Sequence, residues 1–147
     1  MSGAAFWRTA LPPHLRIMCC ASRHASNVRS EEDHMEHPSV IRPAEHAIYR
    51  ADKMGKHTLF ESARLLVGLN AFEPGQEHTL HAHAGMDKVY QVIEGEGVFL
   101  LEARELPMRA GDLLVAPQGV PHGVRNTGTG RLLVLAILAP APAGAAP

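Results

Sequence analysis

The chain has 147 residues, of which 46% are hydrophobic, and this is the length and composition of one globular domain. Fourteen Lys and Arg against fifteen Asp and Glu give a net charge of −1, without the broad positive surface that nucleic-acid binding needs. No apolar run approaches the roughly 18 residues of a membrane-spanning helix. Composition and charge therefore predict a globular protein with no nucleic-acid and no membrane partner.

The first 34 residues differ from the rest of the chain. Before Glu31 they contain arginines but no acidic residue, and they show no clear hydrophobic period. An Arg-rich segment poor in acids is typical of a transit peptide, but we favour the alternative of an extension ahead of a later start at Met35. We expect residues 1–34 to be poorly ordered and residues 35–54 to lead into the folded domain.

Two adjacent cysteines, Cys19 and Cys20, are the only ones in the chain. Neighbouring cysteines rarely close a disulfide without distorting the backbone, and there is no CxxC pair for zinc. Such a composition suits a reducing compartment, so we expect the protein in the cytoplasm.

Short strands separated by turn residues fill the region from residue 55 to residue 138. Apolar or β-branched runs that end at Gly or Pro predict strands over 64–72, 88–93, 98–102, 112–116, 122–126 and 131–138. Gly95 and Gly97 separate two of these strands, and we expect a hairpin turn there. No helical period lasts more than two turns after residue 50, so the sequence predicts a single all-β domain, a sandwich or barrel. The Pro/Ala-rich tail 139–147 is expected to fray.

Two histidines one residue apart, His81 and His83, look like half of a metal site. Residues i and i+2 of a strand point to the same face, so both imidazoles can reach one ion at about 2.0–2.2 Å. His122 lies in a turn-rich stretch and completes a three-histidine face if its strand pairs beside the first. Imidazole suits zinc, copper, iron and nickel, and three histidines leave room for water, oxygen or substrate. His78 is expected to lie off this face, at the surface.

A frame of glycines and prolines surrounds these histidines at fixed spacings. Gly75, His81, His83 and Gly95 form a first motif, and a second motif consists of Gly111, Pro117, Gly119, His122 and Asn126. The two motifs match those of the cupin superfamily, and over about residues 55–138 the chain resembles a small single-domain cupin. The resemblance implies a jelly-roll barrel, the cupin double-stranded β-helix, whose interior holds a metal through the histidines. It also implies a homodimer.

Lys88 stands where the first cupin motif usually has a glutamate. A protonated lysine cannot ligate and repels a divalent ion. Three alternatives follow: the histidines bind metal alone with Lys88 turned outward or beside the site, Asp87 replaces the missing carboxylate, or Lys88 occupies the metal position in a metal-free pocket. Strand alternation separates Asp87 from Lys88 without deciding which points inward. The retained trio of histidines favours one divalent ion per chain, which could be Fe, Mn, Zn, Ni or Cu.

Other polar residues are expected to have structural roles. We expect Tyr90 to pack in the barrel, Asn126 to cap a turn through its side chain, and Lys53 and Lys56 to be solvated charges. The charged residues 102–105 are expected to form a hairpin tip.

Two functions suit such a pocket. The first is a metalloenzyme acting on a small molecule by dioxygenase-like or Lewis-acid chemistry, as an oxidoreductase, isomerase or lyase. Lys88 would then hold an anionic substrate or act as a base. The second is a non-catalytic cupin that binds or senses a small ligand, with a metal-free form in which Lys88 fills the pocket. We favour the enzyme, although the cupin fold serves both functions.

Overall fold

The computed structural model of the chain describes residues 38–142, so the expectations for residues 1–34 and for the end of the tail lie outside the described residues. Within this range no helix is long and apolar enough to cross a membrane. The described elements are η1 (Pro43–His46), β1 (Gly55–Ser62), β2 (Leu65–Phe72), β3 (Glu77–His81), β4 (Asp87–Glu94), β5 (Glu96–Leu101), β6 (Glu105–Arg109), β7 (Leu113–Ala116), β8 (His122–Arg125) and β9 (Leu132–Ala139).

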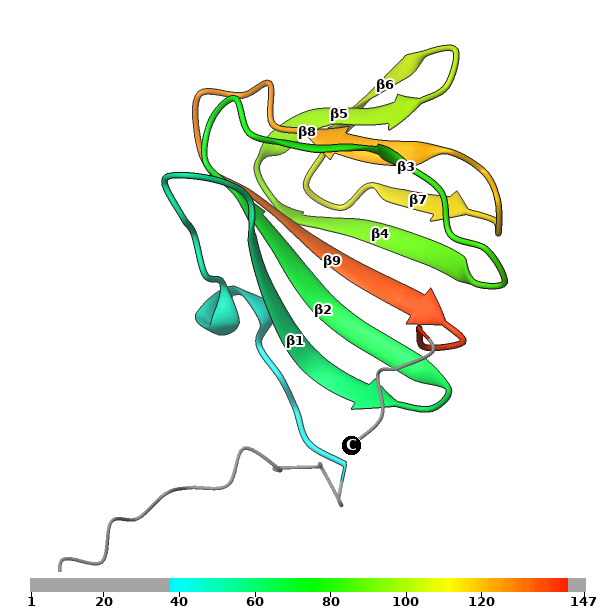
Figure 1. Ribbon diagram of the computed structural model, residues 1–147. Coiled ribbons are helices and arrows are strands. Elements are labelled where there is room, and N and C mark those ends of the chain that lie inside the picture. Colours follow the sequence, from blue (N-terminus) through cyan, green and yellow to red (C-terminus); the bar gives the residue numbers. More distant parts are fainter. Residues whose placement is uncertain (1–37, 143–147) are drawn as a thin grey trace, which may run out of the picture. The chain divides into compact units, whose positions relative to one another are not determined.

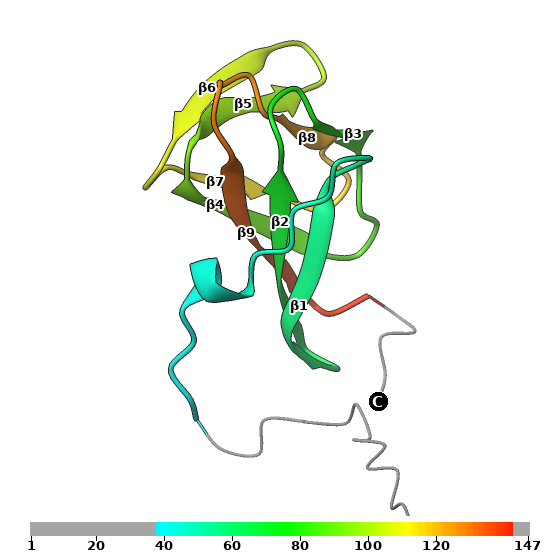
Figure 2. The ribbon, with the colours of Figure 1, turned by 90° about the vertical axis from the view of Figure 1, so that its left-hand side faces the viewer.

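Two antiparallel sheets face each other and enclose the core (Figure 1). The first sheet has the strand order β1-β2-β9-β4-β7, and the second has the order β3-β8-β5-β6. Figure 2, turned by 90°, shows the same two layers. The buried side chains between them are Phe72, Tyr90, Val92, Phe99, Met108, Val124, Leu132, Val134 and Ala136. The structure confirms the predicted all-β jelly-roll fold, and Tyr90 packs in its core as expected.

A second apolar cluster lies on the outer face of the five-stranded sheet. Leu69, Ala71 and Leu133 are buried there, and they alternate along their strands with residues that face the core. Ala47 and Tyr49, from the segment that precedes β1, pack against this cluster. The lead-in segment therefore covers part of the outer face.

The chain crosses from one sheet to the other between β4 and β5. β4 pairs with β7 and β9, whereas β5 pairs with β6 and β8. The expected hairpin at Gly95 and Gly97 is therefore wrong. Gly95 has a φ of 83°, and a Cβ atom there would lie 2.2 Å from the carbonyl oxygen of Arg131. Because only glycine fits this corner, it redirects the chain into the second sheet. The charged tip after β5 does join a hairpin, since β5 pairs with β6.

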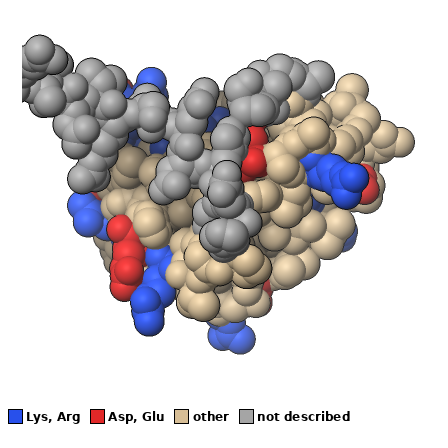
Figure 3. Space-filling model, turned by 90° about the horizontal axis from the view of Figure 1, so that it is seen from below, with Lys and Arg blue, Asp and Glu red and all other residues tan. Residues whose placement is uncertain are grey.

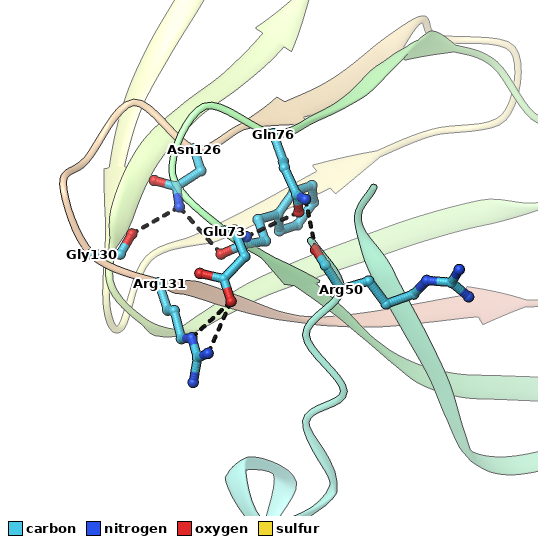
Figure 4. Close-up of polar contacts among 7 residues, drawn as sticks. Arg50, Glu73, Gln76, Asn126, Gly130 and Arg131 are labelled. Atoms are coloured by element: carbon cyan, nitrogen blue, oxygen red, sulfur yellow. Dashed lines mark hydrogen bonds and ion pairs between the residues drawn. The ribbon is translucent and has the colours of Figure 1, made fainter. Parts of the chain in front are cut away.

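Asn126 ties the turn between β8 and β9 to the end of β2 (Figure 4). Its side-chain amide donates to the carbonyl oxygens of Gly130 at 2.9 Å and Phe72 at 3.3 Å. Its Oδ1 accepts from the backbone N–H of Gly128 at 3.0 Å. The residue is buried, so its hydrogen bond to Phe72 is shielded from water, while the other two are partly buried. The predicted turn-capping role of Asn126 is confirmed.

Charged side chains are dispersed over the face of the molecule that is seen from below (Figure 3). Lys and Arg stand apart from one another there, with uncharged residues between them and Asp or Glu nearby. The described residues that are visible on this face form no continuous surface of one sign, in keeping with the balanced composition of the chain (Figure 3).

Candidate metal centre

His81 and His122 lie side by side because their strands pair. His81 is the last residue of β3, His122 is the first residue of β8, and the two are register partners. Their ring centroids are 4.6 Å apart. His83 follows in the loop before β4, where its carbonyl oxygen accepts a hydrogen bond from the N–H of Gly119 at 2.8 Å. A glycine of the second motif thus anchors a histidine of the first.

The three histidines form one cluster of possible ligands. One ring nitrogen from each of His81, His83 and His122 lies within 4.8 Å of the other two. Nitrogen atoms that bind one ion at about 2.0–2.1 Å in a tetrahedral site stand roughly 3.3 Å apart, so the rings would have to move closer together around a bound ion. The structure therefore brings together the three histidines that the sequence singled out.

Backbone carbonyls fix the tautomer of two of these imidazoles. Nδ1 of His81 lies 2.7 Å from the carbonyl oxygen of Thr79, and Nδ1 of His122 lies 2.8 Å from that of Val120. A carbonyl only accepts, so Nδ1 donates in both rings and the lone pair of each ring lies on Nε2. Hydrogen bonds of this kind orient histidines that bind metals.

His122 supplies a test of whether a metal fits. Its Nε2 is buried and has no hydrogen-bond partner among the described residues. A buried acceptor without a partner costs about 1–3 kcal/mol. A metal ion bound to this lone pair would remove that cost, and the two neighbouring imidazoles are ligands of the same kind. The donor set therefore fits a divalent transition-metal ion.

Lys88 enters the site from the opposite sheet. It lies on β4 with Ala116 and Leu138 as register partners, and it is only 4% exposed. Its Nζ lies 3.4 Å from Nε2 of His81 and 3.4 Å from Nε2 of His83. The amine therefore lies beside the possible ligand atoms, in the place where the first cupin motif has its glutamate.

Asp87 occupies the other side of β4. Adjacent strand residues point to opposite faces, and Asp87 is exposed where Lys88 is buried. Its Oδ1 accepts a hydrogen bond from the backbone N–H of Gln118 at 2.9 Å. The cluster of possible ligands among the described residues contains the three histidines and not Asp87. A ligand role for Asp87 stays a prediction.

Burial keeps the imidazoles of the site neutral. Burial, followed by the charge of Lys88, lowers the pKa of His83 to about 4. Burial is also the main cause that lowers the pKa of His81 and of His122. Burial, followed by the charge of Lys56, lowers the pKa of Lys88 to about 8. At pH 7 the histidines are neutral, as metal binding requires, while Lys88 is mostly protonated.

His78 belongs to the same cavity, and the expectation that it lies at the surface is wrong. Its ring centroid is 4.1 Å from that of His81, and its Nδ1 is buried without a hydrogen-bond partner among the described residues. His78 pairs with Val124 and His81 pairs with His122, so β3 has one residue more than β8 between these pairs. Such a bulge reverses the strand alternation and brings both rings to one side. No sequence signal marks it.

His78, His81 and His83 border a cavity of about 290 Å³ that also touches β1 and β2. Its charged and imidazole-bearing lining residues are Lys56, His57, His78, His81, His83 and Lys88. Among the described residues that line it, none is Asp or Glu. Lys56, expected to be only a solvated charge, thus contributes to a cavity whose charged side chains are all positive.

Known proteins resemble this chain over most of the described range. A cupin domain model matches residues 68–138, which include the three histidines and Lys88. The oxalate-binding protein of Thermotoga maritima is 32% identical over 111 residues, which are 76% of this chain and 91% of that protein. This chain belongs to the cupin superfamily. The resemblance carried by the two sequence motifs is thereby confirmed.

Solved structures share the fold of this cupin. TT1209 from Thermus thermophilus is 40% identical, has a TM-score of 0.67, and is matched over 98% of its chain and 70% of this one. A Thermotoga maritima protein described as a predicted oxalate decarboxylase is 26% identical, has a TM-score of 0.61, and is matched over 98% of its chain and 69% of this one. These proteins support the jelly-roll assignment over about 70% of the chain.

Proposed function

We propose that this cupin binds one divalent metal ion through His81, His83 and His122, and that the ion and Lys88 together bind a small carboxylate anion. One observation carries the proposal. His81, His83 and His122 form one cluster of neutral imidazoles, and two of them, His81 and His83, line a cavity that is also lined by two lysines and, among the described residues, by no carboxylate. Neutral ligands and neighbouring cations together leave the cavity with a strong positive charge once a metal is bound.

The histidines perform the first part of this function. The hydrogen bonds of His81 and His122 to backbone carbonyls hold two rings in place and direct Nε2 toward the common point. A bound divalent ion would supply Lewis-acid chemistry or, as iron, oxygen chemistry. Three ligands leave coordination positions open, so a carboxylate oxygen can bind there.

Lys88 performs the second part. A buried ammonium group is costly unless an anion or several acceptors surround it. Its Nζ contacts two imidazole nitrogens at 3.4 Å and the face of Tyr90, whose ring centroid lies 4.6 Å away. A carboxylate bound at this point would pair with the amine and with the ion. The name of the Thermotoga maritima relative, an oxalate-binding protein, supports the same class of ligand.

A specific observation also favours the metalloenzyme alternative. Nζ of Lys88 faces the same point as the Nε2 atoms of His81 and His83. An acid bound there contacts both the ion and an amine that can donate or accept a proton. The non-catalytic alternative uses the same contacts for binding alone. Turnover of the bound acid separates the two functions.

The first experiment measures metal content and carboxylate binding in the same preparations. We expect elemental mass spectrometry to find about one divalent ion per chain, which is lost in His83→Ala and in His122→Ala. We expect calorimetry to show that oxalate binds the metal-loaded protein, and that Lys88→Met keeps the metal but weakens oxalate binding at least about tenfold. No metal above the mutant background after reconstitution would contradict the metal site. A loaded protein that binds no carboxylate would contradict the ligand class.

The second experiment follows the fate of the bound acid. Metal-loaded protein is incubated with the carboxylate that it binds, in air and without oxygen, and products and oxygen uptake are measured. Product that requires the metal and is lost in Lys88→Met identifies an enzyme. Tight binding without product, whichever metal ion the protein is loaded with, identifies a binding protein.

A further inference from the structure

Lys56 lies where the metal cavity meets a second, outer cavity. It is an exposed residue of β1, and it lines the cavity of about 290 Å³ that holds the histidines. It also lines an outer cavity of about 630 Å³ together with Arg50, Lys53 and Glu77. Lys56 is therefore a lining residue that the two cavities share.

No acidic side chain among the described residues neutralises the charge of Lys56. Two other charges of the outer cavity do have partners, since Arg50 pairs with Asp52 at 3.1 Å and Glu77 pairs with Arg125 at 2.7 Å, whereas Lys53 forms no ion pair within the described range. Lys56 forms no ion pair or side-chain hydrogen bond with any other described residue. Its amine can therefore pair with an anionic group of a ligand.

The same charge reaches the metal site. Lys56 and Lys88 line the same cavity of about 290 Å³, so their two positive charges repel each other across it. No carboxylate among the described lining residues offsets this repulsion. A ligand with one anionic group beside Lys88 leaves Lys56 uncompensated, whereas a second anionic group would satisfy both amines.

We propose that Lys56 binds a second anionic group of the ligand, so that the preferred ligand is an acid with two anionic groups held apart by a spacer of several atoms. This inference rests on the proposed function, in which the ion and Lys88 hold the first carboxylate. Water occupies about 30 Å³ per molecule, so a cavity of about 290 Å³ has room for more non-hydrogen atoms than oxalate contains. Oxalate, whose carboxylates are joined directly, would leave much of it filled with water.

The test compares acids of increasing length on the metal-loaded full chain by calorimetry. The series is oxalate, malonate, succinate and glutarate, each beside the monocarboxylate of the same length. We expect succinate or glutarate to bind about tenfold or more tightly than its monocarboxylate and more tightly than oxalate. In Lys56→Gln we expect this preference to fall to about twofold or less. Lys53→Gln is the matched control, because Lys53 lines only the outer cavity, and it should keep the preference.

Each other outcome contradicts the inference. Metal content establishes that the variants are folded, because the metal site requires the folded chain. We expect Lys56→Gln to fold, since Lys56 forms no hydrogen bond or ion pair with another described residue. A diacid preference that survives Lys56→Gln, or one that Lys53→Gln reduces equally, would show that Lys56 forms no separate subsite. Oxalate as the tightest ligand would also overturn the inference while leaving the proposed function in place. If the loaded protein binds no acid of the series, the proposed function itself fails.

Discussion

Lys88 determines how much positive charge surrounds a bound metal ion. Its Nζ lies 3.4 Å from Nε2 of both His81 and His83, so a carboxylate at this position could reach the same ion. Lys88→Glu replaces a repelling charge with a ligand, and we expect at least about tenfold tighter metal binding together with weaker binding of carboxylate anions. Chelator competition measures the first effect, and calorimetry with oxalate measures the second.

Asp87→Asn is the matched control on the neighbouring residue. The carboxylate of Asp87 accepts the N–H of Gln118 on the outer side of β4, so metal affinity should not change. The free energy of unfolding should fall by about 1 kcal/mol at most, because an exposed hydrogen bond is weakened. A loss of metal affinity would instead support Asp87 as a ligand and would contradict a site built from the histidines alone.

Buried histidines should make folding of the metal-free protein sensitive to acid. Burial lowers the pKa of His83 from 6.5 to about 4 and that of His78 from 6.5 to about 3. Below the unfolded value of 6.5, the unfolded chain binds protons that the folded chain does not. These two groups therefore lower the free energy of unfolding as the pH falls from about 6.5 to 4, and leave it unchanged above that range.

Urea unfolding near pH 7.5, 5.5 and 4.5 measures this effect, since the midpoint reports the free energy of unfolding at a constant slope. His78→Gln replaces a titrating imidazole of the cavity with an amide that does not titrate, so the urea midpoint of this variant should change less with pH. A midpoint that stays constant from neutral to acid pH, or a variant as acid-sensitive as the natural sequence, would show that the cavity admits enough water to solvate the charged rings.

At the scale of elements, the corner between β4 and β5 depends on one glycine. A Cβ atom at Gly95 would lie 2.2 Å from the carbonyl oxygen of Arg131, and its φ is 83°. We expect Gly95→Ala to lower the free energy of unfolding by about 3 kcal/mol or more, because the backbone must shift as well as adopt a strained conformation. Gly75→Ala has a similar φ of 80° with no atom within 4 Å, and should cost only about 1 kcal/mol. Urea unfolding compares them, and equal losses would contradict the close contact.

Strand alternation predicts local faces well but fails where a strand has an extra residue. The spacing of His81 and His83 predicted their common side, and the second motif located His122. His78 was missed because the irregularity within β3 changes which side each residue faces. The alternation of residues along a single strand does not predict such a bulge, because the bulge depends on how β3 pairs with β8.

Long-range pairing also decided what the sequence left open. Lys88 faces inward because β4 lies between β7 and β9, which places Tyr90 in the core on the same side. The sequence of the predicted strand 88–93 was compatible with either Lys88 or Asp87 pointing inward. The mistaken hairpin at Gly95 has the same origin, since adjacent strands were expected to pair and these two belong to different sheets.

At the scale of the whole molecule, the outer face of the five-stranded sheet carries an apolar row across its strands. Val67, Ile137, Val89 and Val115 are successive register partners on β2, β9, β4 and β7. Val115 is 55% exposed and Leu113, on the same edge strand, is 58% exposed. An exposed apolar row at the edge of a sheet is typical of a protein interface. We therefore expect the homodimer implied by the cupin resemblance to form through this apolar row.

Val115→Glu tests this surface, because it places a charge at the most exposed end of the apolar row. We expect light scattering after gel filtration to give about twice 15.9 kDa for the natural sequence and about 15.9 kDa for the variant. Val115 points away from the cavity, so the variant should keep its metal content. Leu80→Glu is the matched control, since Leu80 is also an exposed apolar residue, 44% exposed, but lies on β3 in the other sheet. A dimer that survives Val115→Glu but not Leu80→Glu would place the interface on the sheet of the histidines, and a natural chain that is monomeric would contradict the homodimer.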